Sequence, residues 1–302
     1  MNKSKKLAIA LPAVLLLAAF WLTRPQPLSA SDLPEHTPNA TAGERIFWAG
    51  GCASCHASLV DGRRAKGANK LRLGGGLELD TPFGLFRVPN ISPHEDGIGS
   101  WSTLEFVNAM QRGVAPDGRH YYPSFPYTSY ARMRVEDVID LKAYIDTLPS
   151  VAGRIEDHSL SFPYSVRRGI GAWKRLYLDG QPVIDVGSDE ELLLGRYLVE
   201  GPGHCGECHT PRDALGGLRM EQWLAGAPNL DGAGKIPNIT PAAKELGDWS
   251  VQSIAYYLES GFTPDFDTVG GSMVAVQENL AKLSDADREA IAAYLKAVPP
   301  VE

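Results

Sequence analysis

The chain has 302 residues, enough for two modules, and its 44% hydrophobic and 22% charged residues are ordinary for a folded protein. The formal net charge of −7 argues against nucleic acid as a partner, because nucleic acid requires a basic face. Gly (31 residues) and Pro (22 residues) are plentiful, so we expect many loops and short helices.

An export segment is predicted at the N-terminus. A lysine-rich start at residues 3–6 precedes sixteen apolar residues at 7–22, and Arg24 follows. The candidate cleavage site after Ala30 has the bulky Leu28 where a small residue is preferred, which favours an uncleaved anchor over a cleaved signal peptide. Both alternatives place the protein on the periplasmic side of the bacterial cytoplasmic membrane, N-terminally anchored or secreted.

Helix signals recur along the rest of the chain. Capping boxes, which open helices, occur ahead of each cysteine pair and once between them: 41–44, 102–105 and 188–191. The helix that opens at 102–105 is expected to end at Gly113, and the last helices of the two halves to stop before Pro149 and Pro299. The last of these helices opens at Ser284. No region shows sustained strand alternation, so the sequence predicts an all-α fold.

Two C-x-x-C-H motifs dominate the chemistry of the sequence. Each holds two cysteines three positions apart, followed directly by a histidine: Cys52, Cys55 and His56, then Cys205, Cys208 and His209. Two thiols on one helical turn can add to the two vinyl groups of one porphyrin, and the histidine can then bind the iron. A disulfide would not explain a histidine after both pairs, a zinc site would need four ligands from two distant pairs, and a thioredoxin-type motif would sit on a βαβ pattern that is absent here. The sequence therefore predicts two covalently bound haem c groups.

The two motifs belong to a duplicated unit. Residues 89–113 align without a gap with 237–261, at an offset of 148, and 136–149 align with 286–299, at an offset of 150. We therefore expect four segments, which are an N-terminal signal or anchor with a linker, a first cytochrome c domain, an inter-domain linker and a second cytochrome c domain: 1–40, 41–150, 151–187 and 188–302.

Several stretches resemble a known group. "PNISPHEDGIGSWS", "YPSFPYTSYARM" and "EDVIDLKAYI" are similar to the first module of the multihaem cytochrome c subunits of membrane-bound bacterial alcohol, gluconate and sugar dehydrogenases. "CGECHTPRDALGG" and "GGSMVAVQENLAKLSDADREAIAAYL" resemble their later modules. The resemblance implies class I cytochrome c folds, each wrapped around a haem. It also implies electron transfer from a dehydrogenase to quinone or another cytochrome. Many members carry three modules and a C-terminal membrane attachment, whereas this chain has two modules and an N-terminal candidate.

The sixth ligand of each iron is expected from the loop before the last helix. In the second module this loop offers Met273, which we favour over Met220 because Met220 lies close behind His209. In the first module the methionine of the family would fall on Phe125, which cannot bind iron.

Three other side chains can bind the first iron. Met133 is favoured, because it is the only thioether of its loop. The alternatives are His120, His94, or an iron whose sixth position is left open.

Two further groups of residues have open interpretations. Trp101 and Trp249 hold equivalent places, and either contact haem propionates or pack in the cores. The linker is basic at 167–175, which favours a solvated face over pairing with propionates or with a partner.

Two functions fit these features. The favoured one is a diheme cytochrome c that relays electrons from a periplasmic dehydrogenase to the respiratory chain, with no substrate chemistry of its own. The alternative is a diheme redox enzyme similar to bacterial cytochrome c peroxidases. We find no Leu-His-Asp-Gly stretch of the kind expected in those enzymes.

Overall fold

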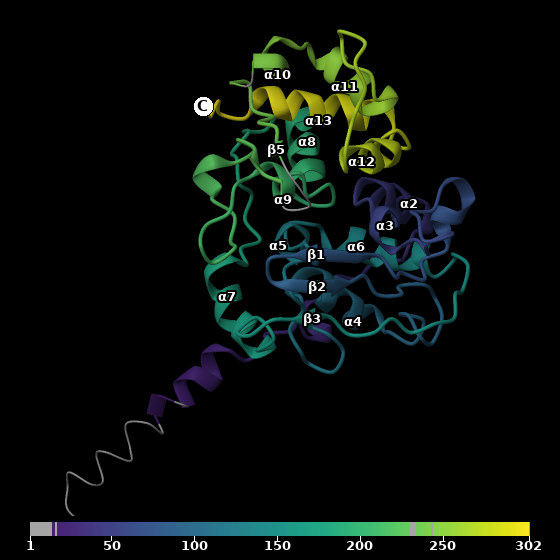
Figure 1. Ribbon diagram of the computed structural model, residues 1–302, viewed down its shortest axis with the longest axis vertical. Helices are drawn as coiled ribbons and strands as arrows, with labels where there is room; N and C mark the ends of the chain where they lie inside the picture. Colours follow the sequence, from purple (N-terminus) through teal and green to yellow (C-terminus); the bar gives the residue numbers. More distant parts are fainter. Residues whose placement is uncertain (1–13, 16, 230–233, 243, 302) are drawn as a thin grey trace, which may run out of the picture.

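The computed structural model describes residues 14–15, 17–229, 234–242 and 244–301. It forms two helical domains, one above the other in Figure 1, with the first domain in blue and teal and the second in green and yellow. A short helix, drawn in purple, leaves the first domain at the end opposite the second domain (Figure 1).

The first domain runs from α2 to α6. Its elements are α2 (Ala40–Ala49), α3 (Cys52–His56), η2 (Gly67–Leu71), β1 (Glu78–Thr81), β2 (Gly84–Arg87), α4 (Thr103–Val107), η3 (Asn108–Arg112, one π-helical turn), α5 (Tyr127–Tyr130) and α6 (Val135–Ile145). A 3₁₀ turn, η1 (Ala30–Asp32), precedes them.

The second domain repeats this plan from α8 to α13, except that α11 stands where the first domain has α4 and η3, and that α10 has no helical counterpart. Its elements are α8 (Glu190–Glu200), α9 (Gly206–His209), η5 (Met220–Gln222), β4 (Ala227–Pro228), β5 (Lys235–Ile236), α10 (Lys244–Asp248), α11 (Val251–Ser260), α12 (Met273–Leu280) and α13 (Asp285–Ala297). The connection between the domains contains β3 (Ser159–Leu160), η4 (Arg167–Gly169) and α7 (Ile170–Tyr177).

In each domain the first and last helices cross at a glycine. A Cβ on Gly43 would lie 1.9 Å from the backbone oxygen of Asp140, and one on Gly195 would lie 1.9 Å from that of Ala290. Only glycine allows this approach, and the close crossing buries large side chains such as Phe47 and Tyr294 completely. Burying a side chain of this size contributes about 1.5–3 kcal/mol.

The helix caps agree with the sequence at two of four predicted starts. Ser102 and Ser284 cap α4 and α13 as predicted, each accepting from the N–H three residues on, and Gly113 ends the π-helical turn with a φ of 57°. The predicted starts at 41 and 188 are wrong, because the caps are Asn39 and Asp189. An Asn or Asp close to a Ser or Thr competes for the same N–H groups.

The all-α prediction is only partly right, because short strands occur. Strand β1 pairs antiparallel with β2, with Leu79 opposite Phe86, and β2 pairs with β3 of the linker, with Gly84 opposite Leu160. Strands β4 and β5 form a second small sheet. The strands have only two to four residues, too few to show an alternating pattern. The linker thus adds a strand to the first domain.

The basic stretch of the linker is only partly a solvated face, which corrects that prediction: Arg168 and Arg175 are exposed, whereas Arg167 and Lys174 pack on the first domain. Arg167 stacks on the ring of Tyr122 at 4.4 Å and donates to the backbone oxygen of His120. Lys174 is 9% exposed and donates to the backbone oxygens of Arg112 and Gly113, each at 2.6 Å. The linker therefore packs on the first domain through its cations.

The domains contact each other through equivalent places of the repeat. Arg45 of α2 donates to Asp287 of α13, with 2.5 Å between Nη2 and Oδ1 and 3.0 Å between Nε and Oδ2. Tyr197 of α8, 152 positions after Arg45, donates to Asp137 of α6, 150 positions before Asp287. Each domain thus offers its first and last helix to the other.

None of the helices in the described residues is long and apolar enough to cross a membrane. Residues 17–22 are helical, with large apolar side chains exposed. Most of the predicted signal or anchor, residues 1–13 and 16, lies outside the described residues.

Candidate functional site

The first C-x-x-C-H motif forms helix α3, entered through Gly51 in the left-handed region at a φ of 58°. The Nδ1 atom of His56 lies 2.9 Å from the backbone oxygen of Pro89. A carbonyl oxygen only accepts, so Nδ1 carries the proton and Nε2 keeps its lone pair. The imidazole is therefore oriented and in the tautomer that binds a metal through Nε2.

The second motif repeats this arrangement. Residue His204 precedes Cys205 with a φ of 39°, and the Nδ1 atom of His209 lies 2.8 Å from the backbone oxygen of Pro237. Pro89 and Pro237 are equivalent in the repeat. Burial lowers the pKa of both His56 and His209, although the bond to the carbonyl oxygen opposes it. Both rings are thus neutral near pH 7, as iron ligands must be.

The four cysteines lie within the described residues and none is in a disulfide. Burial raises the pKa of the free Cys52 and Cys205 side chains to about 12, so both are neutral thiols before a haem is attached. Two thiols and one Nε2 lone pair within one helical segment fit a covalently attached haem with a proximal histidine. Cys52, Cys55 and His56 would hold one group, and Cys205, Cys208 and His209 the other.

The two attachment segments touch each other. The Nε2 atom of His204, just before Cys205, lies 3.3 Å from the backbone oxygen of Gly50, two residues before Cys52. The ring of His204 also lies edge-on to Tyr130 of α5, at 5.7 Å between centroids. The interface therefore joins the haem-binding parts of both domains.

A residue inside the first motif reaches the second domain. The Nδ2 atom of Asn279 donates to Ser54 Oγ at 2.6 Å, and Ser54 Oγ in turn lies 3.3 Å from the backbone oxygen of Ala275. Both partners lie on α12, the helix that begins at Met273. Helix α3 of the first domain thus holds the segment that carries the predicted sixth ligand of the second.

The reverse contact uses the equivalent residue. Glu207 stands in the second motif where Ser54 stands in the first, and it accepts from Thr128 at 2.7 Å and from Ser129 at 3.0 Å. Both donors lie on α5 of the first domain. Arg212 neutralises the carboxylate at 2.7 Å. Sequence reasoning missed Ser54 and Glu207, because nothing local marks a contact between distant segments.

The predicted ligand Met273 is half-buried at the start of α12, against the core of the second domain. Its rival Met220 lies in η5 and is 37% exposed. In the first domain, Phe125 is half-buried and contacts the rings of Tyr121 and Tyr130. Burial raises the pKa of Tyr130, whose hydroxyl lies near Cys52 and Cys55, so it stays protonated.

The candidates for the first iron lie in different surroundings. Met133 is 5% exposed in the core of the first domain, and its Cγ faces Gly201 of the second. Leu283, at the equivalent position, is also buried. The Nε2 atom of His120 is bonded to the backbone oxygen of Thr23 at 2.9 Å, and the Nδ1 atom of His94 accepts from a nearby backbone N–H. Ligation by Met133 or by either histidine stays a prediction.

Trp101 and Trp249 are both half-buried and pack against their cores. Their backbone N–H groups donate at equivalent places, to Ile98 and Leu246. Contact with haem propionates stays a prediction.

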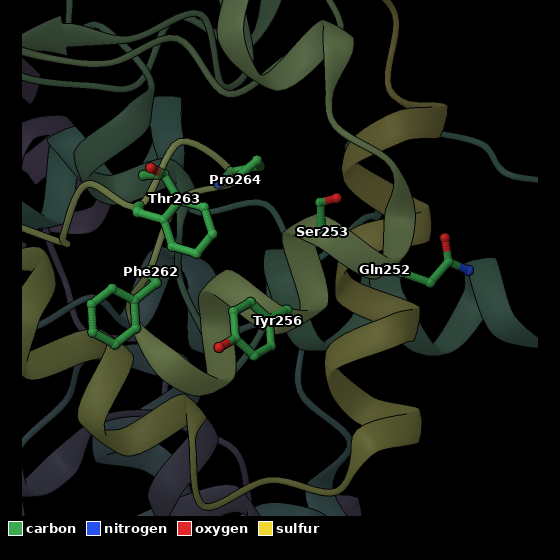
Figure 2. A pocket seen from close by; sticks show the side chains of 7 residues that line it. Gln252, Ser253, Tyr256, Phe262, Thr263 and Pro264 are labelled. Atoms are coloured by element: carbon green, nitrogen blue, oxygen red, sulfur yellow. The ribbon is translucent and has the colours of Figure 1, made fainter.

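The two domains differ in one face. A shallow apolar pocket of about 480 Å³ lies on the second domain, where Tyr256 of α11 and Phe262 of the next loop line it (Figure 2). In the first domain the position of Tyr256 is taken by Asn108, whose side chain binds the backbone of Leu28 at 2.6 and 3.2 Å. The N-terminal segment thus covers this face of the first domain, whereas the equivalent face of the second domain is open.

Two helical domains, each with a C-x-x-C-H helix and a proximal histidine oriented by a proline carbonyl, define a c-type cytochrome with two haems. The family model for cytochrome c matches residues 40–149 and 195–299. The chain therefore belongs to the cytochrome c family, and it carries two covalently bound haem c groups.

Similar proteins agree with this class. A diheme cytochrome c-type protein of Cereibacter sphaeroides is 50% identical over 303 residues, which cover 100% of both chains. The fructose dehydrogenase cytochrome subunit of Gluconobacter japonicus is 37% identical over 97% of this chain and 59% of its own. The cytochrome c subunit of a quinone alcohol dehydrogenase of Gluconacetobacter polyoxogenes is 35% identical over 91% and 60%. The resemblance to dehydrogenase cytochrome subunits is thus confirmed, and the chain spans about three-fifths of their length.

Proposed function

We propose that this protein relays electrons between a periplasmic dehydrogenase and the respiratory chain. The observation that carries the proposal is the contact between the two haem-attachment segments, through His204 and Gly50. Two redox centres held on one interface allow an electron that enters at one haem to leave at the other. The cytochrome subunits of fructose and alcohol dehydrogenases are related in sequence, which supports a dehydrogenase as donor.

The chain's own residues perform defined tasks in this relay. His56 and His209 would hold the irons as neutral ligands, and the carbonyl oxygens of Pro89 and Pro237 fix the rings. When bound, the haems supply the reversible one-electron chemistry. Ser54 and Glu207 tie each attachment helix to the other domain, which keeps the two centres at a constant separation.

The sixth ligands are part of the proposal. Met273 is proposed for the second iron, because a thioether raises the potential and suits electron transfer. For the first iron we propose Met133, with His120 as the alternative. Visible and EPR spectra of Met133→Ala and His120→Ala, each in a Met273→Ala background, separate them. If the double variant without Met133 keeps a methionine-ligated low-spin haem, Met133 is a core residue.

The acceptor and the location follow from the same assignment. We propose quinone or another cytochrome as acceptor, and attachment through the N-terminal segment to the periplasmic face of the cytoplasmic membrane. The lysines at 3–6 before the apolar residues 7–22 support this orientation. The relatives reported above are cytochromes and dehydrogenase subunits, so they do not support the peroxidase-like alternative.

The function is tested on membranes from cells that produce the intact chain or a variant with Cys55 and Cys208 replaced by Ala. A pyridine haemochrome assay should give two haems per intact chain. Adding fructose, gluconate or ethanol in turn should reduce the haems with at least one substrate, and the variant should lose electron flow from that substrate to oxygen. Haems that no dehydrogenase substrate reduces, but that hydrogen peroxide reoxidises catalytically, would favour the enzyme instead.

A further inference from the structure

The chain just after the N-terminal helix is part of the first domain. The backbone N–H and C=O of Leu28 both bond to the side-chain amide of Asn108, and the side chain of Leu28 packs against the first core. The backbone oxygen of Thr23 accepts from His120, which is 4% exposed. Residues 23–28 therefore form a strap, a segment that fills a face of the folded domain.

The linker closes over the end of the N-terminal helix. Arg168 donates to the backbone oxygen of Phe20 and to Thr23 Oγ1, each at 3.0 Å, and Arg175 donates to the backbone oxygen of Leu22 at 3.3 Å. These carbonyls lie in the last turn of the helix, where cations are favourable. A Cβ on Gly171 would lie 2.2 Å from the backbone oxygen of Thr23, so the linker helix approaches as closely as glycine allows. The N-terminal helix is thus fixed to the body.

Apolar side chains are exposed on both sides of this junction. On the N-terminal helix, Leu17 is 69% and Phe20 62% exposed, and on the linker Phe162 is 83% and Leu176 67% exposed. A shallow pocket of about 630 Å³ lies between the helix and the linker and is lined by both, including Val166. The N-terminal helix projects from the end of the molecule opposite the second domain (Figure 1), whereas α7 also contacts a loop of the second domain, since Trp173 donates to the backbone oxygen of Leu215 at 2.9 Å.

Arginines accompany these side chains. Arg168 stacks on Phe20 at 4.4 Å, and Arg24 and Arg175 stack on Trp21 at 5.0 and 5.3 Å. Exposed apolar and aromatic side chains mixed with arginines are typical of surfaces that enter the headgroup region of a bilayer. There the aromatic rings lie at the boundary and the cations bind lipid phosphates.

We propose that the N-terminal helix and the linker segments 162–166 and 175–176 form one membrane-contact surface, which fits a bilayer containing anionic phospholipids. A bilayer fits better than a protein, because the exposed helix continues the apolar residues that begin at residue 7. The surface turns the face of the first domain that carries the N-terminal helix towards the membrane. The proposal rests on the proposed membrane location and adds the linker as a second contact.

The test uses the full-length holoprotein, in which the four native cysteines are bound to haem. A single cysteine at Phe162 or Leu176 carries a nitroxide, and Phe266 on the second domain, 87% exposed, gives a matched control. The labelled proteins are reconstituted into vesicles of phosphatidylcholine and phosphatidylglycerol (3:1), and the value measured under nitrogen is subtracted to remove relaxation by the haems. EPR power saturation then compares collisions with oxygen and with a water-soluble nickel complex.

The ratio of oxygen to nickel collisions should rise severalfold at 162 and 176 on reconstitution and stay unchanged at 266. The rise should be smaller in phosphatidylcholine alone. If 162 and 176 respond as 266 does while the protein still floats with the vesicles, the anchor stands and the linker contact is refuted. An intact mass that lacks residues 1–30 would also overturn the proposal. Neither result touches the electron relay, which the substrate-reduction experiment tests separately.

Discussion

Replacing Arg45 by Met is expected to leave the buried carboxylate of Asp287 without its counter-ion. Asp287 is 4% exposed and receives both bonds of the guanidinium across the domain interface. Breaking a buried ion pair on one side costs about 3–5 kcal/mol. The side chain of Arg45 is 34% exposed and Ser284 also bonds to Asp287, so we expect a smaller loss of about 2–3 kcal/mol. That is roughly a 30- to 150-fold change in the unfolding equilibrium.

The loss should depend on pH in a defined direction. Burial raises the pKa of Asp287, but Arg45 and Ser284 outweigh it, so the pKa lies below its ordinary value. The native pair therefore stabilises above about pH 4 and is lost as the pH falls through the folded-state pKa. In Arg45→Met, burial is no longer opposed by a cation. The difference between the two proteins is thus largest at pH 7. It shrinks as the pH falls, first through the raised pKa of Asp287 in the variant, above about pH 4, and then through the lowered pKa of the native protein.

Urea unfolding followed by far-UV circular dichroism and Soret absorption measures this loss. Tyr197→Phe is the matched control at the equivalent position: it removes a neutral donor and leaves Asp137 paired with Arg134, so about 1 kcal/mol is expected. A second change, Asp287→Asn, should restore most of the stability of Arg45→Met. A loss for Arg45→Met below about 0.5 kcal/mol, or one that does not change between pH 7 and pH 4, would refute the reasoning.

Two further outcomes follow from single residues. Met273→Ala should remove the methionine–iron absorption band and lower the potential of one haem, whereas the control Met220→Ala should leave band and potential unchanged. Visible spectra and redox titration measure both, and an unaltered band in Met273→Ala would exclude Met273 as the ligand. Gly195→Ala should force α8 and α13 apart and lower the free energy of unfolding by about 2–3 kcal/mol, whereas the control Gly169→Ala, with nothing within 4 Å of its Cβ, should be neutral. Thermal unfolding measures this, and equal midpoints for the two variants would contradict the argument that the helices cross at Gly195.

The two covalent haems could be predicted because the chemistry of their attachment is local. Two thiols and a histidine within five residues identify covalent haem attachment without knowledge of the rest of the fold. The caps at Ser102 and Ser284 were predictable for the same reason. The short strands could not be predicted, since two to four residues leave no periodic signal.

Contacts between distant segments were beyond the sequence pattern. Ser54 and Glu207 occupy variable positions of the C-x-x-C-H motifs, and their partners on α12 and α5 are more than seventy positions away in the sequence. The sequence predicted a solvated face for the linker arginines, because their charge alone does not show which backbone oxygens and aromatic rings they contact in the fold. Such roles depend on how the domains pack, and packing is decided by long-range shape.

The domain interface is built like that of a two-fold symmetric dimer whose subunits have been joined into one chain. In such a dimer every contact occurs twice, so each substitution acts twice. Here the paired contacts have become separate: Arg45 and Tyr197 occupy equivalent places, and so do Ser54 and Glu207. The linker also keeps the halves together at any protein concentration. One haem environment can therefore change its ligand or its potential without imposing the same change on the other, which is what a relay with a direction requires.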